Sequence, residues 1–159
     1  MLTVSAHPFA NNGQSILHLP SSFLKVALRA KSVERSILVT DASAPAGAAF
    51  GRYQLGEQAV DHTPDGRIVL AGTEKLAGSA LRMDRGVENL MHLGGLSLRD
   101  SVQLATTNPA RVTKIAGRQH GLVKGDRADF IVFRYDENGK KISVEATYVD
   151  GQRCFGAAA

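Results

Sequence analysis

Residues 36–41 read SILVTD, and the unbroken apolar run within them predicts a strand that is buried on both faces. Strands of this kind are typical of parallel sheets that helices cover. The segments before it read QSILHL (residues 14–19) and PSSFLKVALRAK (residues 20–31), which predict a short strand and an amphipathic helix. Together the three segments predict a parallel β–α–β unit and place the protein in the α/β class.

The predicted helix has its own start signal and an apolar stripe. Ser21 or Ser22 can cap it by accepting a hydrogen bond from an unpaired backbone N–H. Its apolar side chains recur three and four positions apart: Phe23, Leu24, Ala27, Leu28 and Ala30. Residues 1–13 contain Pro8 and the run Asn-Asn-Gly, which disfavour regular structure, so we treat them as a lead-in.

The pattern changes after residue 51. Between residues 52 and 72, two short β segments flank the sequence Thr-Pro-Asp-Gly, which predicts a hairpin because Asp and Gly tolerate positive φ. Helical patterns return at residues 83–93, from Ser97, and from Asn108 as a cap to near Gly117. The end of the chain predicts antiparallel strands at 130–135 and 142–148, then a short strand that carries Cys154.

Length and composition exclude several classes of protein. The chain has 159 residues, fewer than the roughly 250 of a complete (β/α)8 barrel. The net charge of +4 is spread along the chain, without the basic clusters of nucleic-acid-binding proteins. Cys154 is the single cysteine, and we see neither a signal peptide nor a membrane-length apolar run. We therefore expect a cytoplasmic protein with no nucleic-acid or membrane partner.

The five histidines do not form a metal-binding motif. They are His7, His18, His62, His92 and His120. No two of them are spaced as His-x-His or lie four residues apart on a helix. We therefore expect that this chain alone forms no metal site.

Asp41 is the candidate catalytic residue, because it follows the most apolar strand, and parallel strands carry their chemistry at their carboxyl ends. A carboxylate buried there would need a cation, a metal-bound water or several donors. The alternative is that Asp41 caps the following loop through the loop's own amides. His18 lies near the same end of the preceding predicted strand, where it either shares a crevice with Asp41 or is a hydrogen-bonded structural histidine.

Five segments in order carry a family resemblance. They read HLPSSFLKVALRAK, ILVTDASAPAG, GTEKLAGSALRMDRGVENL, LSLRDSVQLATTNPARV and GLVKGDRADFIVF, and they span roughly residues 14–155. The K-G-x-x-A-D and N-P-A patterns resemble many amidohydrolases. The VTDA followed by AG, and the LAGS before a Met-Asp helix start, resemble the C-terminal part of the N-acetylglucosamine-6-phosphate deacetylases, members of the metal-dependent amidohydrolase superfamily.

The resemblance implies a fold and domain boundaries. Residues 14–117 would form the last two βα units of a partial TIM (β/α)8 barrel, with the hairpin at 52–72 as an insertion. Residues 118–156 would form C-terminal strands of the small β-sandwich domain that lies beside the barrel.

The resemblance also implies a hydrolase of amino sugar metabolism that cleaves the acetamide of an N-acetyl amino sugar phosphate. Asp41 matches the aspartate that deprotonates a water held by a divalent metal, zinc or iron. His18 matches a substrate-binding histidine, and Leu76, Ala77 and Gly78 match a loop that lies along the sugar through backbone contacts.

The family's metal ligands, a glutamate and two histidines, lie upstream of the region that this chain resembles, so we expect no metal ligand here. We expect a fragment or one part of a split enzyme, either homo-oligomeric or paired with a missing N-terminal portion. Two alternatives stay open: a non-catalytic remnant, and an amidohydrolase that acts on another amide.

Overall fold

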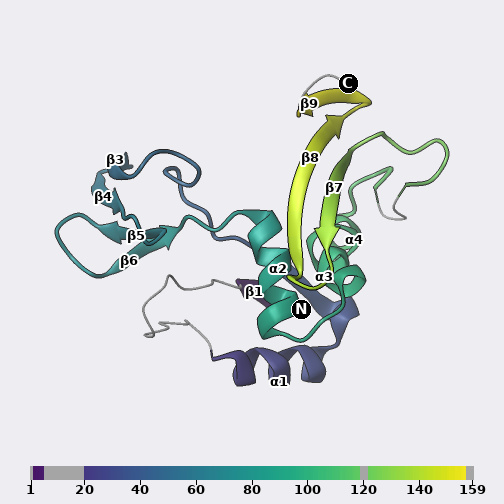
Figure 1. Cartoon of the computed structure of the whole chain (residues 1–159), viewed down its shortest axis with the longest axis horizontal. Helices are drawn as coiled ribbons and strands as arrows, with labels where there is room; N and C mark the ends of the chain where they lie inside the picture. The colour runs from purple at the N-terminus through teal and green to yellow at the C-terminus, as the bar shows by residue number, and fades with distance from the viewer. Residues whose placement is uncertain (1, 6–19, 119–121, 157–159) are drawn as a thin grey trace.

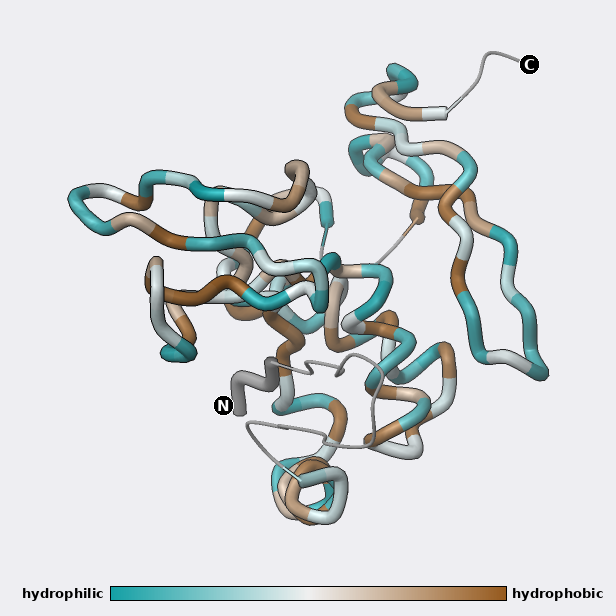
Figure 2. Tube along the Cα trace, turned by 60° about the vertical axis from the view of Figure 1, so that its left-hand side comes forward, coloured by the Kyte–Doolittle hydropathy of each residue, from teal (hydrophilic) through white to brown (hydrophobic). Residues whose placement is uncertain are grey.

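The computed structural model describes residues 2–5, 20–118 and 122–156 (Figure 1). Within these ranges the strands form three sheets: a parallel pair, a four-stranded antiparallel sheet and a three-stranded antiparallel sheet. Hydrophobic residues are spread along the described chain and are not gathered in one segment (Figure 2). The α/β class predicted from the sequence is confirmed, with two of the three sheets antiparallel. None of the helices in the described part of the chain combines the length and the apolarity needed to cross a bilayer.

The parallel pair consists of β1 (Leu2–Ser5) and β2 (Ser36–Val39), in the register Leu2 to Ser36. Helix α1 (Ser21–Lys31) and the 3-10 helix η1 (Val33–Arg35) lie between them in sequence. The predicted parallel β–α–β unit is therefore present, but its first strand lies in the stretch that we expected to be irregular. The sequence of β1 is LTVS, whose β-branched residues favour a strand, and the breakers come after it. The predicted strand at 14–19 lies outside the described residues.

Helix α1 begins differently from the prediction. Pro20 is its N-cap, in an extended conformation, and no side chain caps the helix. The carbonyl of Pro20 accepts from Leu24 N at 3.1 Å, so the N-cap lies one residue before Ser21, the first of the two predicted caps. Of the predicted stripe, Leu24 and Leu28 are buried, whereas Phe23 is 52% exposed. The buried stripe is narrow because only one side of the helix packs against the core.

The four-stranded sheet has the order β3 (Gly51–Leu55), β4 (Gln58–His62), β5 (Arg67–Leu70) and β6 (Leu76–Ser79). The predicted Asp-Gly hairpin joins β4 to β5 and is confirmed, with Thr63 N donating to Arg67 O at 2.9 Å. The sequence pattern missed a second turn at Gly56, where φ is +59°, and the continuation of the sheet into β6.

The helices α2 (Met83–Leu93), α3 (Leu98–Ala105) and α4 (Thr107–Thr113) follow. Ser97 caps α3 as predicted, with its side chain accepting from Asp100 N. Asn108 is not a cap, because α4 begins one residue earlier and the Asn108 side chain is buried. The helix ends at Thr113, where Lys114 takes a left-handed conformation, rather than near Gly117.

The predicted strands at the end of the chain are confirmed as β7 (Phe130–Asp136), β8 (Lys141–Val149) and β9 (Gln152–Phe155). In Figure 1, β8 runs beside α2. The two elements are bonded, because the buried Glu88 of α2 accepts from Ile142 N at 2.7 Å. A hydrophobic core joins this sheet to α1, α2, α3 and β2. Its buried members are Leu24, Leu28, Leu38, Val87, Leu90, Met91, Leu104 and Ile142.

Candidate functional site

Asp41 lies just beyond the carboxyl end of β2, as the sequence predicted. Its backbone is left-handed, with φ of +54°, and the residue is exposed. The expectation of a desolvated carboxylate is therefore wrong, because the burial of β2 ends before Asp41. The alternative interpretation as a loop cap finds no support either. Ala42 N donates instead to Thr40 Oγ1 at 3.3 Å, and among the described residues no donor contacts the Asp41 carboxylate.

The carboxyl end of β2 is bonded to β6. Ser79 N donates to Asp41 O at 3.1 Å, and Ser43 N donates to Ser79 O at 3.0 Å. These two bonds form a parallel bridge between Ala42 and Ser79. The structure thus brings together the two segments that the sequence analysis selected separately, Asp41 and the residues Leu76 to Gly78.

Leu76, Ala77 and Gly78 form a strand, and our expectation of a loop is wrong. They belong to β6, which pairs with β5 on one side and reaches the Asp41 segment at its carboxyl end. Leu76 is exposed, Ala77 and Gly78 are half-buried, and Ser79 is buried. A local sequence pattern could not predict this strand, because its partners are set by tertiary contacts.

Gly78 is packed against Ser43. Its φ is +117°, and a Cβ at this position would lie 2.7 Å from Ser43 Oγ and 2.9 Å from Ser43 Cβ. Ser43 Oγ is itself buried and has no hydrogen-bond partner in the described structure. The absence of a side chain at Gly78 is therefore required by the fold, independently of the ligand contact that the family resemblance implies.

His62 is a residue that the sequence analysis did not select for the site. It lies on β4, is 6% exposed, and its Nδ1 has no hydrogen-bond partner within the described ranges. Its ring packs edge-on against Phe50, with 5.0 Å between the ring centroids. Phe50 ends the loop that starts at Asp41, so His62 holds the far end of that loop. Alternation along β4, which places Val60 and His62 on one buried face, is the signal that could have found it. His18 lies outside the described residues.

The described residues around Asp41 do not by themselves make up a metal site. Among the described residues, no three His, Cys, Asp or Glu side chains are grouped so that they could hold an ion. Asp41 offers one carboxylate, and catalytic zinc sites in proteins use three protein ligands.

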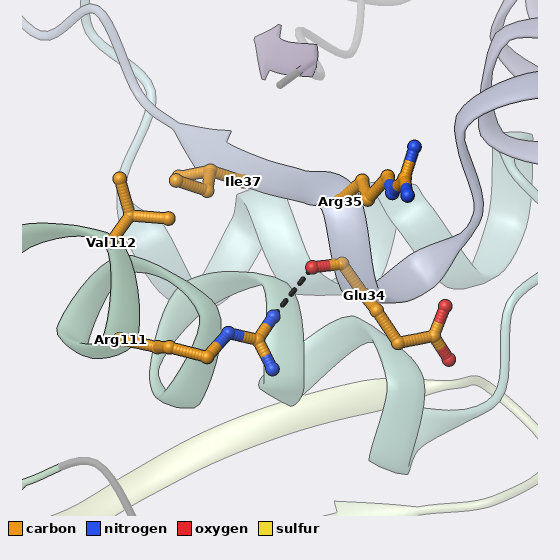
Figure 3. Close-up of a pocket in the computed structure, with 5 residues that line it drawn as sticks. All are labelled: Glu34, Arg35, Ile37, Arg111 and Val112. Atoms are coloured by element: carbon orange, nitrogen blue, oxygen red, sulfur yellow. Dashed lines mark hydrogen bonds between the residues drawn. The ribbon is translucent and has the colours of Figure 1, made fainter.

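A cavity of about 340 Å³ lies at the opposite end of β2 from Asp41. Figure 3 shows its lining: Glu34, Arg35, Ile37, Arg111 and Val112. Arg111 of α4 donates to the Glu34 carbonyl at 2.5 Å, and this bond ties α4 to η1. The cavity therefore belongs to the packing of the amino end of β2 and not to the candidate site.

A sequence profile of the amidohydrolase family matches residues 25–154, and the chain belongs to that family. Among curated relatives, an N-acetylglucosamine-6-phosphate deacetylase of Bos taurus is 34% identical over 137 residues, which are 86% of this chain and 32% of the bovine one. An N-acetylgalactosamine-6-phosphate deacetylase of Escherichia coli O157:H7 is 33% identical over 120 residues, covering 75% of this chain and 30% of that one.

A solved structure agrees with these relatives. It is the N-acetyl-D-glucosamine-6-phosphate deacetylase of Mycobacterium smegmatis, a variant in complex with N-acetyl-D-glucosamine-6-phosphate. The TM-score is 0.70 at 29% identity, over 86% of this chain and 35% of that one. The chain thus spans about a third of the length of the relatives it matches.

Proposed function

We propose that this chain supplies the general base and a sugar-facing strand of a deacetylase that acts on an N-acetyl amino sugar 6-phosphate. The observation that carries the proposal is the bridge between Ala42 and Ser79, which holds Asp41 beside Leu76–Gly78. Two segments with different implied roles, one chemical and one in binding, are adjacent although they are far apart in the sequence.

Asp41 acts as the general base of the proposed reaction. It accepts a proton from the water that attacks the acetyl carbonyl, and returns it to the sugar amine as the C–N bond breaks. The exposure of Asp41 and the absence of a donor to its carboxylate among the described residues support this role.

The strand Leu76–Gly78 contacts the sugar through its backbone, and His18 is a second substrate-binding residue. Strand β6 is an edge strand of its sheet, and its outer side is bonded to the Asp41 segment through Ser79. An edge strand presents backbone groups on its outer side that can bond to another molecule. In β6 these are the groups of Leu76–Gly78, which precede the bridge at Ser79. Sugar hydroxyls, which both donate and accept, suit such an edge.

The likeness to the M. smegmatis enzyme supports the proposed architecture. Residues 14–117 form the last two βα units of a partial TIM barrel with an insertion at 52–72, and residues 118–156 contribute strands to a small β-sandwich domain. A divalent metal, zinc or iron, is held by residues outside this chain. The complete enzyme is cytoplasmic. It is either a homo-oligomer or a pair of this chain with an N-terminal portion.

A chimaera tests the proposal. The C-terminal part of the M. smegmatis enzyme that matches this chain is replaced by this chain, and acetate release is measured with zinc or ferrous iron present. The proposal predicts acetate release from N-acetylglucosamine 6-phosphate. A folded, metal-loaded chimaera that releases none from any acetamido sugar phosphate would favour the non-catalytic remnant.

The second candidate substrate is N-acetylgalactosamine 6-phosphate, because the E. coli relative is named for it. The two sugars differ only in the orientation of one hydroxyl group, so both are assayed side by side in the same chimaera. The sugar with the larger kcat/KM is the assigned substrate. Hydrolysis of a cyclic amide, with neither sugar accepted, would support the amidohydrolase of different specificity.

A further inference from the structure

We propose that Ser43 is a positioning residue of the candidate site, because its small side chain lets the β6 strand lie against the end of β2 that carries Asp41, where a larger side chain would push the two apart. The inference rests on the proposed function, since it names a further residue of the same site. It concerns packing between two described segments, and this packing can be measured without the deacetylation assay.

The first argument is the fit between Ser43 and Gly78. A Cβ at Gly78 would lie 2.7 Å from Ser43 Oγ and 2.9 Å from Ser43 Cβ, which is closer than real Cβ contacts. The Ser43 side chain therefore fills the space on the face of Gly78 where a side chain would project. A side chain larger than serine at position 43 therefore fits only if the two segments move apart.

The second argument is that no hydrogen bond within the described residues accounts for the Ser43 side chain. Its backbone N–H donates to Ser79 O at 3.0 Å and its carbonyl accepts from Ala46 N at 2.9 Å. Its hydroxyl is buried and has no partner in the described part of the chain. A buried hydroxyl without a partner costs free energy, so a hydrogen-bonding role within the fold does not explain this residue. Its size does.

The third argument is the place of Ser43 between the two proposed functional segments. Asp41 O accepts from Ser79 N at 3.1 Å, two residues before Ser43 and one residue after Gly78. Widening the contact between Ser43 and Gly78 would strain or break this bond. The Asp41 carboxylate would then move relative to a sugar bound along Leu76–Gly78, and small displacements of a catalytic group lower kcat.

The test compares side chains of different size at position 43, with Ser43→Val as the enlarged variant and Ser43→Ala as the variant that removes only the hydroxyl. Ala44→Val is the matched control, because Ala44 is an exposed residue of the same loop. Amide hydrogen exchange of the chain reports on the bridge through the Ser79 amide. The Thr63 amide, bonded to Arg67 O within the four-stranded sheet, is the internal reference.

The proposal predicts that Ser43→Val removes the protection of the Ser79 amide and leaves that of Thr63. Ser43→Ala and Ala44→Val should keep both. In the chimaera, Ser43→Val should lower kcat by about 100-fold with a much smaller change in KM, because the sugar still binds but is displaced from Asp41. Ser43→Ala should keep kcat near the unmodified value.

The proposal is overturned if Ser43→Val keeps the protection of Ser79, or loses it without a loss of kcat. It is also overturned if Ser43→Ala loses as much as Ser43→Val, since the hydroxyl would then be the active feature. An unmodified chimaera without activity contradicts the proposed function instead, and the exchange experiment still decides whether Ser43 sets the spacing of the two segments.

Discussion

The backbone amide of Ser79 donates to the carbonyl oxygen of Asp41 at 3.1 Å, and this bond joins two segments that the strands β3, β4 and β5 separate in the sequence. The chain leaves β2, forms β3, β4 and β5, and returns through β6 to the strand end where it started. The inserted sheet therefore contributes its last strand to the candidate site. In Figure 1 the rest of the sheet lies to one side of the helices.

The contact between Gly78 and Ser43 predicts the effect of Gly78→Ala. Two effects lower the stability of this variant: alanine is strained at a φ of +117°, and the new Cβ overlaps Ser43. Gly47→Ala is the control, since Gly47 also has positive φ, +85°, but has nothing within 4 Å. We expect Gly78→Ala to lose about 1–3 kcal/mol more than Gly47→Ala in urea unfolding, as is typical of overpacking. Equal losses would show that no overlap with Ser43 exists.

The buried hydrogen bonds of Asn108 predict that Asn108→Ala lowers the free energy of unfolding by a large amount. Its Nδ2 donates to the carbonyls of Val33 and Ser36, both at 2.7 Å, and the residue is 1% exposed. Asn108→Ala leaves both carbonyls without this donor, and we expect a loss of about 2–4 kcal/mol in urea unfolding. Asn138→Ala, in the turn between β7 and β8, is the surface control. A loss within about 0.5 kcal/mol, the range of surface substitutions, would contradict the assigned role.

The hydrogen bonds and ion pairs of Asp129, in the K-G-x-x-A-D motif, predict that the free energy of unfolding depends on pH. The backbone N–H of Asp150, which donates at 2.7 Å, and the guanidinium of Arg118 hold the pKa of Asp129 below its ordinary value. A carboxyl whose pKa is lowered by folding stabilises the protein above its unfolded pKa, about 4, and this contribution is lost as the pH falls through the lowered value.

Asp129→Asn should therefore be less stable than the unmodified chain at pH 7, and the difference should shrink as the pH falls below about 4. Urea unfolding at several pH values measures it. Glu137→Gln, at the turn after β7, removes a carboxylate for which no described partner exists and should show no such trend. A difference that stays constant from neutral to acid pH would mean that Asp129 does not act through its charge.

Local patterns predicted much of the fold. The unbroken apolar residues of β2, the Asp-Gly turn after His62, the Ser97 cap and the alternating strands after residue 130 each depend on neighbours in sequence, and each is present. Asn108 shows the limit of such patterns. Its place before a proline predicted a cap, but its partners, Val33 and Ser36, lie more than seventy residues earlier.

The candidate site shows the same limit. The position of Asp41 at a strand end follows from the apolar run before it, whereas its exposure depends on what packs over that end. The nature of Leu76–Gly78 as a strand depends on β5 and on the Asp41 segment, neither of which a local pattern includes. Ser43 gave no signal at all in the sequence, because its importance lies in its contact with Gly78.

The most direct test of the central claim is the rate of acetate release by the chimaera with Asp41→Asn, compared with the unmodified chimaera and with Glu57→Gln. Glu57 is an exposed carboxylate at the turn between β3 and β4, far in sequence from the bridge. A general base contributes about 10²–10⁴-fold, so we predict a loss of kcat of that size for Asp41→Asn and none for Glu57→Gln. Near-normal turnover of the Asp41→Asn chimaera would contradict the account.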